Sequence, residues 1–315
     1  MIGGRAERTR ISEPYSSLSG PQPVDIVCDI PDSRSELLVL PPDYSAPWPK
    51  VTVVIPTLNE ARNLPHVFAK LPLGLHEVII VDGNSVDDTV VTARRLRPDA
   101  RVITQNRSGK GNALACGFAA ATGDIVAMVD ADGSADPAEI PRFVRALLDG
   151  ADFAKGTRFA YGGGSCDITR MRRLGNRMLS GLVNLLCRTR YSDLCYGYNV
   201  FWRCHVPVFG LDAETRVPAG SGTRLWGDGF EVETLINIRI AQARLKVEEV
   251  ASFEHSRIHG VSNLNAVSDG WRVLRTIIAE RYYYRRRPAQ SDHASSGSLM
   301  QSQPPVIRES ASRIP

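Results

Sequence analysis

The stretch that decides the fold is Val126-Ala127-Met128-Val129-Asp130-Ala131-Asp132-Gly133-Ser134. Its first four residues form an apolar run that ends at a Gly-containing turn, a pattern typical of a short buried strand. Two carboxylates, Asp130 and Asp132, follow this strand. On an extended backbone they project to the same side, where like charges repel unless a cation lies between them. Carboxylate oxygens are ligands that Mg²⁺ and Mn²⁺ prefer, so we predict that this pair binds one of these metals.

A second interpretation of the two acids is purely structural. A helix is expected to begin near Pro137, and acidic side chains stabilise the first turn of a helix. An isolated D-x-D pattern would favour this interpretation, so the choice depends on the rest of the chain.

Composition excludes several classes of protein. Apolar residues make up 43% of the 315 residues, which is enough for a hydrophobic core. The net charge of +4 is too small to indicate a nucleic-acid-binding protein. The six cysteines form no C-x-x-C pair and are interpreted as reduced thiols: Cys28, Cys116, Cys166, Cys187, Cys195 and Cys204. No stretch reaches the roughly 18 apolar residues that cross a bilayer, and residues 1–10 lack a signal-peptide core. We expect a cytoplasmic protein, either free or bound peripherally at the inner face of the membrane.

Strands and helices alternate upstream of the D-x-D stretch. Apolar runs predict strands at residues 51–56, 77–81 and 101–104, and a helix is predicted from residue 57 to about 71, with Thr57 or Asn59 as its cap. Four alternations within about 90 residues predict a mostly parallel sheet flanked by helices. Ligands bind such sheets at the carboxyl ends of the strands, where Pro56, Asp82, Asn106-Arg107 and Asp130 are expected.

The predicted domain organisation places this sheet between two weakly ordered ends. Residues 1–49 are rich in Ser and Pro and indicate a disordered or weakly ordered arm, and residues 288–315 indicate a disordered tail. Residues 50–287 are predicted to form one α/β domain, with a nucleotide-binding half at 50–135 and an acceptor half at 136–287.

Four motifs resemble those of the inverting glycosyltransferases of family 2, which share the GT-A nucleotide-diphospho-sugar transferase fold. The matching residues are Ile55-Pro56-Thr57-Leu58-Asn59-Glu60, Val81-Asp82-Gly83-Asn84-Ser85-Val86-Asp87-Asp88-Thr89, Gly109-Lys110-Gly111-Asn112-Ala113 and Met128-Val129-Asp130-Ala131-Asp132-Gly133-Ser134. Each motif is weak alone, but their order and spacing match the family. The resemblance runs from about residue 51 to 287.

This resemblance implies roles for particular residues in binding a nucleoside-diphosphate sugar. Pro56, Asn59 and Glu60 would border the nucleoside, Asp82 would contact the base, and Lys110 would belong to the same donor site. Asp130 and Asp132 would hold the metal at the diphosphate. An alternative for Asp82 is a residue that closes its own turn.

Basic residues downstream suggest how phosphate groups are bound. Arg158 ends a predicted strand and could stabilise the departing diphosphate, since a guanidinium matches phosphate oxygens, although a surface salt bridge is the alternative. Residues 169–190 place apolar side chains along one helical stripe and carry six arginines without an acid. This pattern fits contact with an anionic membrane surface or with a phosphate-bearing acceptor, and together with the closing helix at 269–287 it indicates peripheral membrane contact. A helix packed on the sheet with a solvated basic face is an equally strong interpretation of this pattern.

The segment from residue 192 to 201 resembles the subgroup that makes polyprenyl-phosphate sugars, the relatives of dolichol-phosphate mannose synthase. In that subgroup an Arg-x-x-Gly-x-Ser segment lies beside the site, which implies that Arg257 and Ser262 hold a phosphate. A phosphate acceptor attacks without a base, whereas a hydroxyl acceptor would need one, for which Asp228 and Glu231 are the candidates.

The favoured function is therefore metal-dependent, inverting transfer of a hexose from GDP-mannose or UDP-glucose to polyprenyl phosphate. Three alternatives remain: transfer to a hydroxyl of a soluble acceptor, a non-catalytic nucleotide-sugar-binding protein, and nucleotidyl transfer. The last would want a Gly-rich loop after the first strand, which this chain lacks.

Overall fold

The computed structural model describes residues 48–216, 224–260 and 266–286. The predicted arm at 1–49 and the tail at 288–315 lie almost wholly outside these ranges. The strands are β1 Val51–Thr57, β2 Glu77–Asp82, β3 Arg101–Thr104, β4 Ile125–Met128, β5 Phe153–Thr157, β6 Gly164–Ser165, β7 Asn199–Trp202, β8 Val247–Ala251 and β9 Phe253–Glu254. The helices are α1 Leu64–Ala69, α2 Thr89–Leu96, α3 Lys110–Ala120, α4 Ile140–Leu148, α5 Arg170–Cys187, α6 Val206–Phe209, α7 Val232–Gln242 and α8 Ala266–Arg286, with 3₁₀ turns at Pro137–Glu139 and Arg203–His205.

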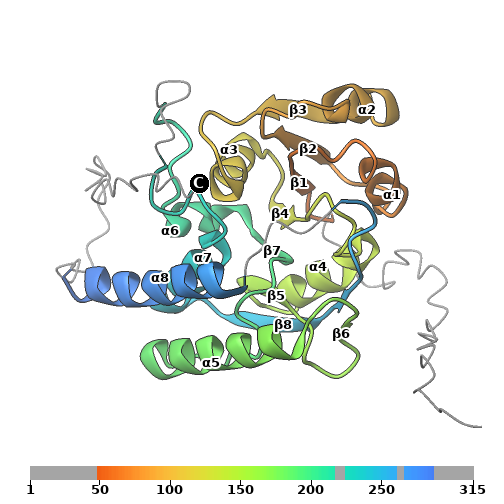
Figure 1. Cartoon of the computed structure of the whole chain (residues 1–315). Coiled ribbons are helices and arrows are strands. Elements are labelled where there is room, and N and C mark those ends of the chain that lie inside the picture. The colour runs from red at the N-terminus through yellow and green to blue at the C-terminus, as the bar shows by residue number, and fades with distance from the viewer. Residues whose placement is uncertain (1–47, 217–223, 261–265, 287–315) are drawn as a thin grey trace, which may run out of the picture. The chain divides into compact units, whose positions relative to one another are not determined.

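Seven strands form the main sheet in the order β3-β2-β1-β4-β7-β5-β8 (Figure 1). All neighbouring pairs are parallel except those that involve β7, which runs antiparallel to β4 and to β5. The predicted mostly parallel sheet is therefore confirmed. Its register places Thr57 beside Asp82, so the loops that follow β1 and β2 emerge side by side.

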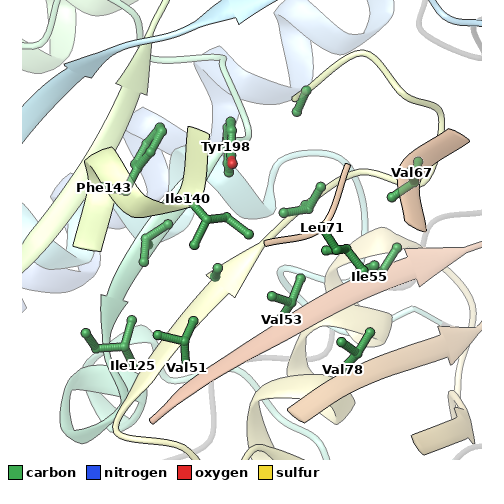
Figure 2. Packing of buried hydrophobic residues seen from close by; sticks show 14 of the residues in the cluster. Val51, Val53, Ile55, Val67, Leu71, Val78, Ile125, Ile140, Phe143 and Tyr198 are labelled. Atoms are coloured by element: carbon green, nitrogen blue, oxygen red, sulfur yellow. The ribbon is translucent and has the colours of Figure 1, made fainter. Parts of the chain in front are cut away.

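Alternate side chains of β1 enter two different cores. Val51, Val53 and Ile55 belong to a cluster with residues of α1 and α4, some of which Figure 2 labels, and with Ala93 of α2. Val54 instead packs with α3, α6 and α7 on the other face. A strand buried on both faces reads as a continuous apolar run, which is why the sequence predicts it well. Each fully buried aliphatic side chain contributes about 1.5–3 kcal/mol to this packing.

A third cluster joins α5 and α8 to α7. Val183 of α5 packs with Val273 and Ile277 of α8 and with Ile238 of α7. Within the described ranges, no helix has both the length and the apolar character that a bilayer crossing requires.

Candidate active site

The two acids of the D-x-D stretch lie in the turn that follows β4. The N–H of Val129 donates to the carbonyl of Val54, so the sheet holds the chain up to the residue before Asp130. Gly133 then takes a left-handed conformation with φ +77°. The N–H of Ser134 donates to Asp132 Oδ1 at 2.9 Å, which fixes that carboxylate. The acids are thus presented at the carboxyl edge of the sheet.

Lys110, the first residue of α3, bridges the D-x-D turn to α7. Its Nζ lies 2.7 Å from Asp130 Oδ1 and 2.6 Å from Glu233 Oε1. Burial alone would lower the pKa of Lys110, but the two carboxylates outweigh burial and the net shift is upward. The ammonium is therefore held charged between them.

Close backbone packing sets the position of Lys110. The N–H of Gly111 donates to the carbonyl of Asp228 at 2.8 Å. A Cβ at Gly111 would lie 1.7 Å from the carbonyl oxygen of Gly227, so only glycine permits this approach. The G-K-G pattern thus brings the start of α3 against the segment that leads into α7.

Arg257 neutralises the second acid. Its guanidinium lies 3.1 Å from Asp132 Oδ2 and 3.2 Å from Glu60 Oε1. Burial raises the pKa of Glu60, although hydrogen bonding from Asn63 and the charge of Arg257 oppose the rise. Arg257 therefore connects the loop after β1 to the D-x-D turn.

Residues 255–260 lie across the D-x-D turn, and we call this segment the strap. The N–H of His255 donates to the carbonyl of Ser134 at 2.8 Å, and the N–H of Ile258 donates to the carbonyl of Asp132 at 3.2 Å. The Asn63 amide donates to the carbonyl of His259 at 3.1 Å. Backbone hydrogen bonds as well as ion pairs thus hold the strap. Ser262, which follows it, lies outside the described residues.

The predicted nucleoside residues gather at the ends of β1 and β2. Pro56 is the penultimate residue of β1 and lies opposite Val81 in the register. Asn59 has a left-handed φ of 58°, and its side chain accepts from the N–H of Val86 at 2.8 Å. The carboxylate of Asp82 accepts from the N–H groups of Asn84 and Ser85, so it closes its own turn.

The helix predicted from residue 57 is wrong in its start. α1 begins at Leu64, with Asn63 at the N-cap position. The left-handed Asn59 interrupts any helix there, because an L-residue in that conformation cannot continue a right-handed helix. Residues 58–63 instead form a loop that joins the loop after β2.

Arg158 is not free to meet a diphosphate. Its guanidinium lies 2.7 Å from Asp193 and 3.0 Å from Glu254, and only 9% of its side chain is exposed. Burial would lower the pKa of Arg158, but the pair with Asp193 and the charge of Glu254 drive it upward. Neither the predicted diphosphate contact nor a surface salt bridge describes this buried cation. It instead anchors Glu254, the residue before the strap.

Asp228 is also committed to a partner. Two nitrogens of the buried Arg107 donate to its two oxygens, each at 2.9 Å, and the N–H of Leu225 donates to it at 2.7 Å. Both oxygens of Asp228 therefore already accept hydrogen bonds from Arg107, so in this structure the carboxylate is not turned toward an acceptor hydroxyl as its predicted role as a base would need. Glu231 is half-exposed, and it accepts from the N–H of Gly229 at 3.2 Å.

Two residues of the site were not predicted, and a third was predicted without its partner. Glu233 is missed because a second acid lies two residues before it, and charge alone does not show which of the two faces Lys110. Asp193 is missed because its partner is distant in sequence. Arg107 is expected at the carboxyl edge of the sheet, but its pairing with Asp228 is not predicted, for the same reason.

The charge balance of the connected side chains fits a divalent cation. Among the residues that the structure describes, Glu60, Asp130, Asp132 and Glu233 are paired with two cations, Lys110 and Arg257, which leaves two negative charges within this group. Within the described part of the chain, no cluster of three or more His, Cys, Asp or Glu residues is arranged to hold a metal. Asp130 and Asp132 could supply two oxygen ligands to a divalent cation. The diphosphate of a bound donor and water molecules would supply the other ligands.

Comparison with known proteins agrees with this geometry. A model of Glycosyl transferase family 2 matches residues 52–206. Uncharacterized glycosyltransferases of Mycobacterium bovis and Mycobacterium tuberculosis are 45% identical over 232 residues, which is 71% of this chain and 97% of each relative. The dolichol-phosphate mannosyltransferase of Pyrococcus furiosus is 36% identical over 36% of this chain and 34% of its own length.

Among solved structures, the chain is similar in fold to glucosyl-3-phosphoglycerate synthase from Mycobacterium tuberculosis in complex with phosphoglyceric acid. The TM-score is 0.56 at 24% identity, over 74% of this chain and 80% of that one. The same protein has been solved with Mn²⁺, uridine diphosphate and glucosyl-3-phosphoglycerate, with a TM-score of 0.55 at 24% identity over the same shares of the two chains.

Proposed function

The chain belongs to glycosyl transferase family 2, and on this premise we propose that it transfers a hexose from a nucleoside-diphosphate sugar to polyprenyl phosphate with inversion. The observation that carries the proposal is the pair Asp130 and Asp132 at the sheet edge, where each is held by a separate cation. Such a site suits a ligand that brings both a metal and a diphosphate.

The proposed metal ligands are Asp130 and Asp132, with Mg²⁺ or Mn²⁺ as the cation. Bound there, the metal would stabilise the negative charge that develops on the leaving diphosphate. Lys110 and Arg257 supply positive charge to the same edge, so they favour the charged leaving group over the neutral sugar. Both are preorganised, because Glu233 and Glu60 hold them from the other side.

We propose that the nucleoside lies over the ends of β1 and β2. Pro56, Asn59 and Glu60 border this region, and the buried Asp82 is the proposed contact to the base. The proposed donor is GDP-mannose or UDP-glucose. The shape of the pocket, rather than a charged sequence motif, decides which of the two is bound. Ser262 remains a proposed phosphate contact alongside Arg257.

The acceptor attacks the anomeric carbon from the face opposite the diphosphate, which inverts configuration. A phosphomonoester has a second pKa near ~6 and is mostly ionised at neutral pH, so it needs no base. A soluble phosphate-bearing acceptor that attacks through a hydroxyl is the second candidate, favoured by the fold neighbour solved with phosphoglyceric acid. With Asp228 held by Arg107, Glu231 is then the proposed base.

The test is a donor and acceptor panel with purified protein and Mn²⁺. GDP-mannose and UDP-glucose are each supplied with a short polyprenyl phosphate, with phosphoglyceric acid, or alone. Sugar on the lipid phosphate supports the proposal, and transfer to phosphoglyceric acid alone supports the second candidate. In that case Glu231→Gln should lower kcat, whereas it should leave transfer to a phosphate unchanged.

A further inference from the structure

The solvent side of α5 carries an uninterrupted apolar row. Met171, Leu174, Met178 and Leu185 expose 69, 61, 68 and 78% of their surface. Spacings of three, four and seven residues place all four on one side of a helix. The opposite side, with Asn176, Ser180 and Val183, is buried against the protein. The apolar row is therefore not part of the core.

Arginines border this row without compensating acids. Arg170, Arg173 and Arg177 are all exposed, and residues 170–187 contain no Asp or Glu. Arg172 lies on another side of the helix and pairs with Asp167 at 3.3 Å. The exposed side of α5 is thus apolar in the middle and positively charged along its border.

Exposed apolar side chains also occur on two neighbouring segments, the loop after β5 and α8. In the loop after β5, Tyr161 is fully exposed, and the guanidinium of Arg173 lies 5.8 Å from the ring centre of Phe159. On α8, which lies beside α5 in Figure 1 and shares its buried cluster, Trp271 and Ile278 are exposed and one heptad apart. More than half of the large apolar side chains exposed in the described residues lie on these three segments. Elsewhere they occur singly, as is ordinary for a surface.

We propose that α5, the loop of residues 158–165 and α8 form a docking surface for an anionic lipid bilayer. Apolar side chains enter the interface while arginines meet the phosphate groups of the lipids, the arrangement of an interfacial amphipathic helix. A symmetric contact with a second copy would place the same arginine-bordered face against itself. The exposed arginines of α5 would then face those of the second copy, and residues 170–187 contain no acid to pair with them, which disfavours that occupant.

This surface connects directly to the donor site. β6 pairs with β9, and Arg158 and Ser165 both contact Glu254, the residue before the strap. The segment that leads into α5 is thus in direct contact with the residue that precedes the strap. The surface stands on its own observations, whereas its purpose, delivery of a lipid-borne acceptor, rests on the proposed function.

The test is flotation of the full-length chain with vesicles of phosphatidylcholine alone and of phosphatidylcholine mixed with phosphatidylglycerol. We expect binding to the mixed vesicles, weaker binding at high salt, and little binding to phosphatidylcholine. Met178→Glu and the double variant Arg173→Glu/Arg177→Glu should each lower the bound fraction at least about tenfold. Val91→Glu, at an equally exposed apolar position on α2, is the matched control and should bind like the wild type.

Equal binding by Met178→Glu and the wild type would overturn the proposal. So would a dimer in light scattering that Met178→Glu converts to monomer while no variant binds vesicles, since the face would then join two copies. Release of nucleoside diphosphate in vesicle-free solution, with donor, Mn²⁺ and a short polyprenyl phosphate as acceptor, serves as the separate readout. Flotation without donor turnover by any variant would keep the docking surface and refute the proposed function.

Discussion

Arg257 illustrates how much of the site depends on single side chains. Its planar guanidinium reaches Asp132 and Glu60 at once, and 28% of the side chain is exposed. A lysine at this position offers one point charge and cannot bridge both carboxylates with the same geometry.

We therefore predict that Arg257→Lys lowers kcat/KM for donor turnover about tenfold and that Arg257→Met lowers it about 100-fold, because preorganised charge at the diphosphate is lost. Steady-state release of nucleoside diphosphate measures both. Arg142→Met, at an exposed arginine of α4, is the control. Equal activity of Arg257→Met and this control would remove Arg257 from the donor site.

Lys155 is a buried cation outside the donor site. Its ammonium donates to the carbonyl of Tyr196 at 3.1 Å, and burial lowers its pKa despite the nearby charges of Asp193 and Glu249. The unfolded chain keeps this proton up to a pKa of 10.5, whereas the folded chain loses it at lower pH. Between these two pKa values the unfolded state binds more protons, so the free energy of unfolding rises with pH.

Replacement of Lys155 with methionine should abolish this rise of the unfolding free energy with pH. Urea unfolding of the wild type and Lys155→Met at several pH values below 10.5 is the measurement. Two curves that stay parallel with pH would show that the lysine titrates alike in both states.

At the level of elements, the start of α3 is the most tightly constrained. Gly111→Ala should lower the free energy of unfolding by about 1–3 kcal/mol and displace Lys110, because the added Cβ meets the backbone carbonyl of Gly227. A Cβ added at Gly175 in α5 would meet no atom within 4 Å, so Gly175→Ala should raise the free energy of unfolding by about 0.5–1 kcal/mol. Chemical denaturation measures the free energy of unfolding of both variants. A Gly111→Ala variant as stable as the wild type would contradict close packing at this position.

The strands and the carboxyl edge could be predicted from sequence because β1, β2 and β4 are short apolar runs that end in polar turns. Such runs have one stable place, the middle of a sheet covered on both faces. The start of α1 could not be predicted, since it depends on Asn59 binding the loop at Val86, 27 residues away.

The partners of the charged residues were equally hidden. Arg158 reads as a free cation in the sequence, but it pairs with Asp193, 35 residues away, and with Glu254, 96 residues away. Asp228 reads as a free acid and is taken by Arg107, 121 residues away. A sequence shows which charges exist, whereas the fold decides which of them neutralise one another.

In the whole molecule, two separate regions are proposed to bind the donor and the lipid. The proposed donor site lies at the loops after β1, β2 and β4 and at the strap, and the proposed lipid-binding surface lies on α5 and α8. Arg158 and Glu254 lie between the regions, since they fix β9 next to the strap.

Glu254→Gln should therefore weaken the connection between them. We expect a melting temperature a few degrees lower, because one partner of a buried ion pair is lost, together with a rise in KM for the acceptor that exceeds the rise for the donor. Differential scanning calorimetry and steady-state kinetics measure these effects. Unchanged kinetics with a lower melting temperature would confine Glu254 to stability.

The central claim is that Asp130 and Asp132 bind the metal and diphosphate of the donor. The most direct measurement is the rate of nucleoside-diphosphate release with Mn²⁺ for the wild type, Asp132→Asn and Asp136→Asn. Asp136 lies four residues further along the same loop, where it caps the 3₁₀ turn and pairs with Lys70. We expect a loss of at least about 100-fold for Asp132→Asn and a nearly unchanged rate for Asp136→Asn. Equal rates for the two variants would contradict it.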